Sequence, residues 1–220
     1  MSDPKAAAPP TWPFRRSVRV TGGALRDLVL TRIVKHWVDL CVEGTENLDG
    51  LASSALFIFN HGDDFDVPVL YAALPAKIRN RLSVATGSNI IDEHPILAFV
   101  IRFFYAGFSF ARQPPYRPSL RYVGELVASG RHILLAPEGQ LSETGELGEF
   151  KDGIGLLAVK LGVPVVPMKI TGLYGTVPMH AAWPKRHANA TVHIGAPLHF
   201  GRDEKYRDVT LALRKAVQSL

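Results

Sequence analysis

A histidine and an aspartate with four residues between them follow a short apolar run. The run Ala55–Asn60 is predicted to be a strand, and His61 stands at its end. Asp66 comes just before a helical pattern over Val67–Leu74, in which Pro68 suits the first turn. A helix that folds back toward the strand brings the carboxylate of Asp66 to the imidazole of His61. A carboxylate bonded to one ring nitrogen selects the tautomer and raises the basicity of the other nitrogen, which makes a general base.

Three other interpretations fit the same segment. In the first, His61 is an ordinary histidine of a turn, without a chemical role. Asp63 and Asp64 fit the start of a helix, where carboxylates accept hydrogen bonds from free N–H groups and favour the helix dipole. The acidic cluster with His61 also offers the ligands of a metal site. The segment by itself therefore leaves catalysis, capping and metal binding open.

Two further polar groups are predicted at strand ends. The apolar run His132–Ala136 leads through a proline to Glu138 and Gly139, and the run Phe108–Ala111 leads to Arg112. In a largely parallel sheet such ends share one edge, where ligands usually bind. Arginine suits a phosphate because its planar fork binds bidentately. Taken singly, Glu138 and Gly139 are better explained as a common turn, and Arg112 as a surface arginine.

The elements that would position these residues alternate along the chain. Seven apolar runs are predicted to be strands: Leu40–Glu43, Ala55–Asn60, Leu82–Ala85, Phe108–Ala111, His132–Ala136, Val163–Ile170 and Ala190–Ile194. Helical patterns lie between and after them: Val67–Leu74, Pro95–Phe104, Ser119–Ser129, Ile154–Leu161 and Asp203–Leu220. This alternation predicts the α/β class, a single domain with a mixed, mostly parallel sheet flanked by helices.

Composition narrows the class of protein. Hydrophobic residues make up 47% of the 220 residues and charged residues 20%, which is typical of a globular chain. The single cysteine, Cys41, excludes an internal disulfide and a cysteine-based zinc site, and favours a reducing compartment. No secretion signal is recognisable. The most apolar stretch, Ile96–Ala111, contains Arg102 and falls short of the roughly 20 residues of a membrane span.

The positive charge is concentrated at the N-terminus. Residues 1–40 hold seven Lys or Arg against three acids, within a net charge of +5 for the chain. We expect 1–38 to be a basic tail and amphipathic helix, with helical periodicity over 22–38, and 39–220 to be the folded domain. The helix fits packing on its own domain or lying on lipid. The body lacks a basic stripe with interleaved aromatics, so no nucleic-acid partner is expected.

The order of the motifs resembles a known signature. The succession is Asn60-His61-x4-Asp66, then Gly107 to Arg112, then Pro137-Glu138-Gly139, then Val163–Met168. It resembles the four blocks of the lysophospholipid and glycerol-phosphate acyltransferases, the 1-acylglycerol-3-phosphate acyltransferase-like proteins with an HX4D motif. The run from Ser142 to Gly153 is similar to the text after that family's third block. The resemblance covers roughly residues 40–200.

The resemblance implies an enzyme of lipid metabolism and phospholipid biosynthesis. In such an O-acyltransferase His61 would deprotonate an acceptor hydroxyl and Asp66 would orient His61. Arg112 would bind the acceptor phosphate, and Glu138 and Gly139 would shape the acceptor pocket. No metal or cofactor is implied. Acyl-CoA or acyl carrier protein would be the co-substrate, a lysophospholipid or glycerol-phosphate-like lipid the acceptor, and an anionic membrane surface a partner. The implied location is cytoplasmic, peripheral to the cytoplasmic membrane.

Three departures from the family pattern bear on the acceptor. Asp63 stands where the first block usually has serine, and Gln140-Leu141 stand where the third block usually has Thr-Arg. The segment 84–88 lacks the lysine that many members carry there. The His/Asp pair is intact, so acyl transfer is expected, with weaker use of small phosphate acceptors. The alternatives are a non-catalytic lipid- or acyl-chain-binding protein, an acyltransferase with an unphosphorylated acceptor, and a metal-dependent hydrolase built on His61, Asp63 and Asp66.

Overall fold

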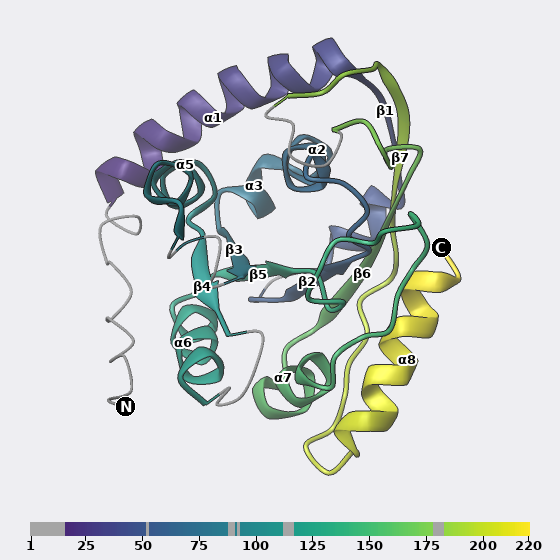
Figure 1. The fold of residues 1–220 in the computed structure, drawn as a ribbon. Helices are drawn as coiled ribbons and strands as arrows, with labels where there is room; N and C mark the ends of the chain where they lie inside the picture. The colour runs from purple at the N-terminus through teal and green to yellow at the C-terminus, as the bar shows by residue number, and fades with distance from the viewer. Residues whose placement is uncertain (1–15, 52, 88–90, 92, 112–116, 178–182) are drawn as a thin grey trace.

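Seven strands form one sheet in the computed structural model, which describes residues 16–51, 53–87, 91, 93–111, 117–177 and 183–220 (Figure 1). The strands are β1 (Val38–Glu43), β2 (Leu56–Phe59), β3 (Leu82–Gly87), β4 (Phe108–Phe110), β5 (His132–Leu135), β6 (Val165–Thr171) and β7 (Ala188–Ile194). Their order is β1-β7-β6-β2-β5-β3-β4, and every neighbouring pair is parallel except β6 and β7. The carboxyl ends of β2, β5 and β6 therefore lie side by side.

Helices cover both faces of the sheet (Figure 1). One layer contains α1 (Arg16–Trp37), α2 (Asp66–Ala73), α3 (Ala76–Arg79) and α5 (Pro95–Tyr105), and the other contains α6 (Arg117–Ala128), α7 (Gly153–Leu161) and α8 (Tyr206–Gln218). A short 3-10 turn, η2 (Thr45–Leu48), follows β1. This is the α/β architecture that the alternation of patterns predicts.

The central strand β2 shows how the two layers are built. Its four residues are all at most 2% exposed. Because side chains alternate along a strand, Phe57 and Phe59 pack into the core beneath α1 and α2, while Leu56 and Ile58 pack into the core beneath α6, α7 and α8. A strand buried on both faces holds its end rigidly, and His61 stands two residues beyond that end.

All seven predicted strands are confirmed within two residues at each end. The N-terminal helix differs most, since α1 begins at Arg16 rather than at residue 22 and ends at Trp37. Val38, expected to close the helix, is instead the first residue of β1, because it pairs with Ala188 of β7. The helices α3 and η2 were not predicted, and each is only four residues long.

Helix α1 packs along α2 and α5 (Figure 1). Val34 is buried at 1% exposure, and Ile33 and Trp37 pack against the same core. Leu25 departs from the predicted apolar face, since it is 43% exposed. None of the helices in the described parts of the chain has the length and apolarity that crossing a membrane requires.

Candidate active site

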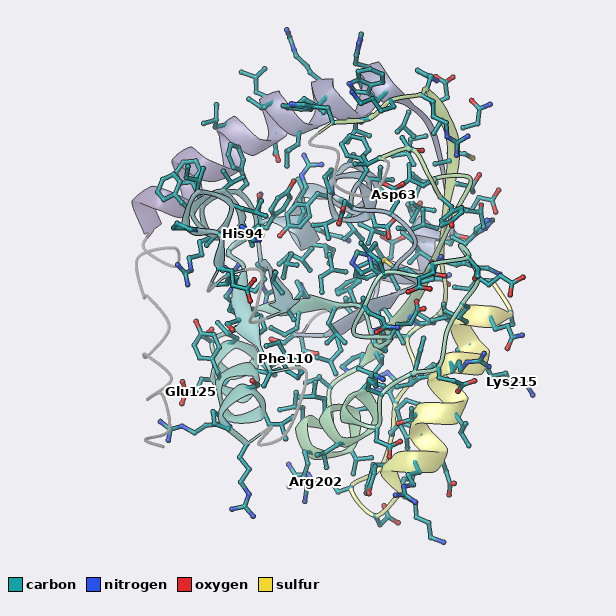
Figure 2. The ribbon with its side chains drawn as sticks, in the orientation of Figure 1. Asp63, His94, Phe110, Glu125, Arg202 and Lys215 are labelled. Atoms are coloured by element: carbon teal, nitrogen blue, oxygen red, sulfur yellow. The ribbon has the colours of Figure 1, made fainter. Side chains whose placement is uncertain are left out.

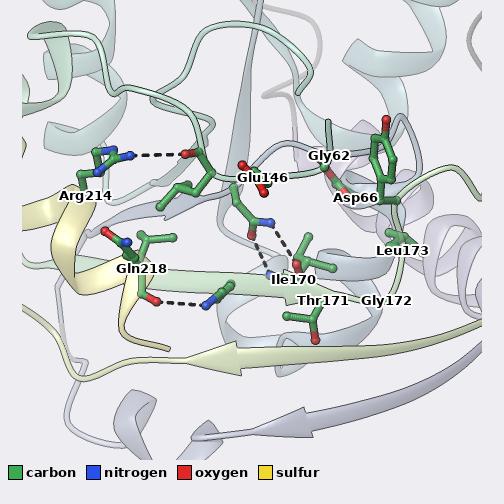
Figure 3. A pocket seen from close by; sticks show the side chains of 15 residues that line it. Gly62, Asp66, Glu146, Ile170, Thr171, Gly172, Leu173, Arg214 and Gln218 are labelled. Atoms are coloured by element: carbon green, nitrogen blue, oxygen red, sulfur yellow. Dashed lines mark hydrogen bonds between the residues drawn. The ribbon is translucent and has the colours of Figure 1, made fainter. Parts of the chain in front are cut away.

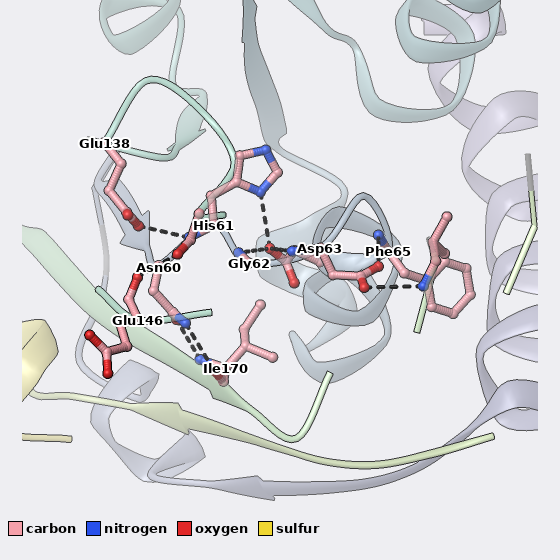
Figure 4. Close-up of polar contacts among 11 residues, drawn as sticks. Asn60, His61, Gly62, Asp63, Phe65, Glu138, Glu146 and Ile170 are labelled. Carbon is pink, nitrogen blue, oxygen red and sulfur yellow. Dashed lines mark hydrogen bonds and ion pairs between the residues drawn. The ribbon is translucent and has the colours of Figure 1, made fainter. Parts of the chain in front are cut away.

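The predicted pair of His61 and Asp66 forms just after the carboxyl end of β2, and Figure 4 shows His61 there. The chain turns sharply after His61, and α2 begins at Asp66. Nδ1 of His61 lies 3.0 Å from Oδ2 of Asp66. The side chain of Asp66 is 2% exposed and that of His61 is 22% exposed. The carboxylate is thus an interior group, and the imidazole reaches the surface of the site.

Three N–H groups converge on one carboxylate oxygen of Asp66. Oδ2 accepts hydrogen bonds from His61 Nδ1, from the backbone N–H of Gly62 at 2.9 Å and from that of Asp63 at 3.0 Å. Burial raises the pKa of Asp66, and the hydrogen bond from His61 opposes that rise. Because the Asp66 carboxylate that faces Nδ1 of His61 accepts a hydrogen bond, the ring proton of His61 is placed on Nδ1. The lone pair is then on Nε2, the nitrogen that can take a proton from a substrate.

A second buried carboxylate stands inside the same turn. Asp63 is 2% exposed, and its Oδ1 accepts from the backbone N–H of Phe65 at 2.9 Å while its Oδ2 accepts from that of Val177 at 3.1 Å. Burial raises the pKa of Asp63, and the backbone hydrogen bonds oppose the rise. The N-cap of α2 is Phe65, without a side-chain hydrogen bond, so neither Asp63 nor the exposed Asp64 is the capping residue.

The loop after β5 is tied to the backbone of His61. Glu138 is 5% exposed, and its Oε1 accepts from the N–H of His61 at 2.9 Å while its Oε2 accepts from the N–H of Gly148 at 2.8 Å. The N–H of Ser142 donates to the carbonyl of His61 at 2.7 Å. A Cβ at position 148 would lie 2.8 Å from Glu138 Oε2, so a larger residue there would displace that carboxylate. Glu138 therefore bonds both to the backbone of His61 and to Gly148 within its own loop.

The strand on the other side holds the same loop through Asn60. Its Nδ2 donates to the carbonyl of Ile170 at 2.9 Å, and its Oδ1 accepts from the N–H of Ile170 at 2.7 Å (Figure 4). This pair of bonds continues the pairing of β2 with β6 one step beyond the strand. Asn60 is therefore fixed on one side by β6, and His61 on the other by Glu138.

The structure brings four of the predicted site residues together and does not place the fifth. His61, Asp66, Glu138 and Gly139 lie at one edge of the sheet, and Gly139 has a φ of 75°. Arg112 lies outside the described residues. Of the fourth motif, Val165, Val166 and Met168 are fully buried, so this stretch forms part of the core.

A cavity of about 520 Å³ lies against Asp66 of the pair (Figure 3). Gly62 and Asp66 line one side, and Lys169 and Arg214 line another. Both cations also bond to carbonyl oxygens, Lys169 to Gln218 at 3.0 Å and Arg214 to Gly148 at 3.0 Å. The cavity meets the carboxylate side of the pair. Among the described residues, no group of three His, Cys, Asp or Glu side chains is arranged to hold a metal ion.

Fold and site together define an α/β protein with a histidine–aspartate pair suited to general-base transfer chemistry. The Acyltransferase family profile matches residues 39–171, which is more than half of the chain, so the protein belongs to the acyltransferase family.

Three proteins with similar sequences are plant enzymes. The chloroplastic 1-acyl-sn-glycerol-3-phosphate acyltransferase LPAT1 of Arabidopsis thaliana is 29% identical over 177 residues, covering 76% of this chain and 48% of that protein. The chloroplastic 1-acyl-sn-glycerol-3-phosphate acyltransferase BAT2 of Brassica napus is 28% identical over 177 residues, covering 76% of this chain and 49% of that protein. The 1-acyl-sn-glycerol-3-phosphate acyltransferase of Cocos nucifera is 26% identical over 201 residues, covering 85% of this chain and 58% of that protein. The chain thus spans about half the length of the first two relatives.

A solved structure shares the fold. The crystal structure of the 1-acyl-sn-glycerophosphate (LPA) acyltransferase PlsC from Thermotoga maritima matches with a TM-score of 0.67. The match covers 94% of this chain and 81% of that one, at 23% sequence identity. At this identity the likeness establishes the fold.

Sequence reasoning missed the residues that hold the loops together. Asn60 was part of the first motif without a role, Asp63 was considered as a cap or a metal ligand, and Gly148 was only part of a linking run. Their partners lie in distant segments, at sequence separations of 110 for Asn60 and Ile170 and 114 for Asp63 and Val177. The departure of Asp63 from the family's serine was the one available signal.

Proposed function

We propose that this chain is an O-acyltransferase that moves a fatty acyl group from acyl-CoA or acyl carrier protein to a hydroxyl of a lysophospholipid or glycerol-phosphate-like acceptor. Membership of the acyltransferase family and its similarity to plant 1-acyl-sn-glycerol-3-phosphate acyltransferases support the reaction class. The carrying observation is the 3.0 Å contact between His61 and a buried Asp66 at the sheet edge. That contact leaves Nε2 of His61 as the base.

The proposed chemistry needs no covalent enzyme intermediate. His61 Nε2 takes the proton of the acceptor hydroxyl as its oxygen attacks the carbonyl carbon of the acyl thioester. The tetrahedral intermediate collapses, the C–S bond breaks, and the leaving thiolate takes the proton from the imidazolium. An ester and a free thiol result. The carboxylate of Asp66 stabilises the transient positive charge on His61, as an oriented acid does in other imidazole bases.

The same proposal assigns the remaining predicted residues. Arg112 binds the phosphate of the acceptor, and Glu138 and Gly139 shape the pocket in which the acceptor lies. The buried carboxylate of Glu138 supports this by fixing the backbone of His61, so that base and pocket keep one relative position. The chain divides into a basic N-terminal segment, 1–38, and an acyltransferase domain, 39–220.

An acyl-transfer assay tests the function. Purified protein is mixed with an acyl-CoA or an acylated carrier protein and a panel of lysophospholipids, glycerol-3-phosphate and unphosphorylated alcohols, and thiol release and ester products are measured together. We expect ester formation that disappears in His61→Ala and persists in the control variant His199→Ala. His199 is an exposed histidine next to Leu198, and Leu198 bridges to the end of β6 that is opposite the site. Acyl-chain binding without turnover would establish the non-catalytic alternative, and thioester hydrolysis without ester would make the protein a hydrolase.

We also propose that the protein works at the anionic surface of the cytoplasmic membrane, on its cytoplasmic side. On α5, Ile96 is 82% exposed and Phe99 57%, and Leu28 on the adjoining α1 is 57% exposed. Arg32 and Lys35 are exposed on α1, downstream of Leu28. Apolar side chains with flanking basic ones suit a bilayer interface with anionic headgroups. Each basic residue near such a surface contributes about 1 kcal/mol.

Vesicle binding tests this location. Phe99→Asp should weaken binding to vesicles that contain phosphatidylglycerol, whereas Leu211→Asp should not, because Leu211 is 62% exposed on α8 in the opposite helical layer (Figure 1). Removal of 1–38, and added salt, should also weaken binding, since screening shortens the reach of the charges. Equal binding by Phe99→Asp and wild type would place the membrane contact elsewhere. A dimer in solution that Phe99→Asp dissociates would identify this surface as a self-association site.

A further inference from the structure

We propose that Asp63 is a positioning residue that fastens the loop carrying His61 and Asp66 to the segment after β6. The inference deepens the proposed acyl transfer and rests on it. In the view of Figure 2, Asp63 lies inside the molecule, below α1.

The two oxygens of Asp63 serve two different segments. Oδ1 accepts from the N–H of Phe65 within its own turn, at 2.9 Å. Oδ2 accepts from the N–H of Val177, which is 114 residues away in sequence, at 3.1 Å. At 2% exposure the carboxylate is shielded from solvent, so these hydrogen bonds are not in exchange with bulk water. The first bond shapes the catalytic turn, and the second joins it to a distant part of the chain.

The distant segment is also tied to the third loop of the site. Tyr174 donates its hydroxyl proton to the carbonyl of Glu143, in the loop after β5. That loop in turn holds His61 through Glu138. The loops after β2, β5 and β6 therefore form a closed circuit of contacts, of which the bond between Asp63 and Val177 is one link. Opening that link leaves the turn with His61 held at its start, by Glu138 from the β5 side and by Asn60 from β6, and releases Asp63 from the segment after β6.

Serine cannot make both contacts. Its single oxygen sits one bond closer to the backbone than a carboxylate oxygen, so it can serve the adjacent N–H of Phe65 in a local turn. The N–H of Val177 would then lose its partner. Asparagine keeps the volume but offers one acceptor oxygen, and its NH2 group faces one of the two donors without a matching acceptor. Aspartate is the side chain of this size that accepts from both segments.

The contacts of Asp63 exclude a direct chemical role. Its two oxygens are directed at backbone N–H groups, and His61 is bonded to Asp66 instead. Loss of Asp63 should therefore leave the base in place and loosen its position. A displacement near 1 Å at a reacting group lowers rates by up to about 100-fold. We expect a roughly 10-fold fall in kcat for Asp63→Ser, with a smaller change in the KM of the acyl donor.

The experiment compares Asp63→Ser with Asp64→Ser, which removes the same charge from an exposed position in the same turn. Hydrogen exchange of the peptide containing Leu173 to Val177 is measured with melting temperature, kcat and KM. For Asp63→Ser we expect faster exchange in that peptide, unchanged exchange in β2 and β5, and reduced kcat. Asp64→Ser should match wild type in all four. Asp63→Asn, which preserves volume, should give the same changes to a smaller extent.

The outcomes separate this inference from the proposed function. Unchanged exchange at Leu173 to Val177 in both Asp63 variants overturns the positioning role, whatever the activity. Faster exchange with unchanged kcat also overturns it, because the link would then be structural only. Absence of transfer in the wild-type protein would refute the proposed function. In that case faster exchange in the Asp63 variants would still establish the link between the two loops.

Discussion

Replacement of either member of the His61–Asp66 pair tests the catalytic assignment most directly. His61→Ala removes the base itself, and loss of a positioned base lowers rates by about 100- to 10,000-fold. His61 stands in a loop and its side chain is 22% exposed, so the change should have little effect on stability. We therefore expect a folded protein with an unaltered melting temperature and almost no ester formation.

Asp66→Asn should have a smaller effect, and the structure sets its size. Three N–H groups converge on Oδ2 of Asp66, so the amide oxygen of asparagine should occupy that place and keep the tautomer of His61. The bond from His61 then loses its charge assistance. Hydrogen bonds to charged groups contribute about 1.5–3 kcal/mol and neutral ones about 0.5–1.5 kcal/mol, a difference on the order of 1 kcal/mol. Because the imidazolium is less stabilised by about this amount, we expect kcat to fall roughly 5-fold.

Initial rates of thiol release, matched to ester product by mass spectrometry, measure both variants on one confirmed donor and acceptor. Circular dichroism and thermal melting check the fold. The reasoning fails if His61→Ala retains more than half of the wild-type kcat. It fails equally if Asp66→Asn is slower than His61→Ala, because Asp66 would then act on the substrate rather than through the histidine.

Three further predictions concern stability, the acceptor and the loop circuit. Burial, with Arg81 and Arg131 nearby, lowers the pKa of His132 from 6.5 to about 4, so the folded state disfavours its protonation. The stability present above pH 6.5 should decline as the pH falls toward 4, by on the order of 3 kcal/mol, and urea unfolding of His132→Asn should show a flatter pH dependence. Leu141→Arg should improve binding of lysophosphatidic acid about 10- to 100-fold in a competition assay, because it restores a cation at this position. Preference for lysophosphatidic acid by the unmodified protein would contradict the expectation that Leu141 weakens the use of phosphate acceptors. Gly148→Ala should displace the carboxylate of Glu138, break the bonds from Glu138 to the backbone of His61 and Gly148, and lower kcat roughly 10-fold. An unchanged kcat would show that Glu138 does not position His61.

Local patterns in the sequence determined the elements and the contact between His61 and Asp66. Apolar runs bounded by turns predicted all seven strands, because a buried strand needs continuous apolar side chains. The spacing of His61 and Asp66 predicted their contact, because both lie within a single strand–turn–helix unit and no distant segment is needed to join them. The predicted α/β class followed from the same local alternation.

Contacts between distant segments were decided by the tertiary structure. The sheet places β2 between β6 and β5, and this order brings Ile170 to Asn60, Glu138 to His61 and Val177 to Asp63. No local pattern encodes strand order, since it depends on how both faces of the sheet are covered at once. The exposure of Phe99 has the same origin: an apolar helix pattern predicts burial, whereas the packed structure leaves that side chain 57% exposed. Sequence thus specified the His61–Asp66 pair, and packing specified what holds the pair and which apolar side chains stay exposed.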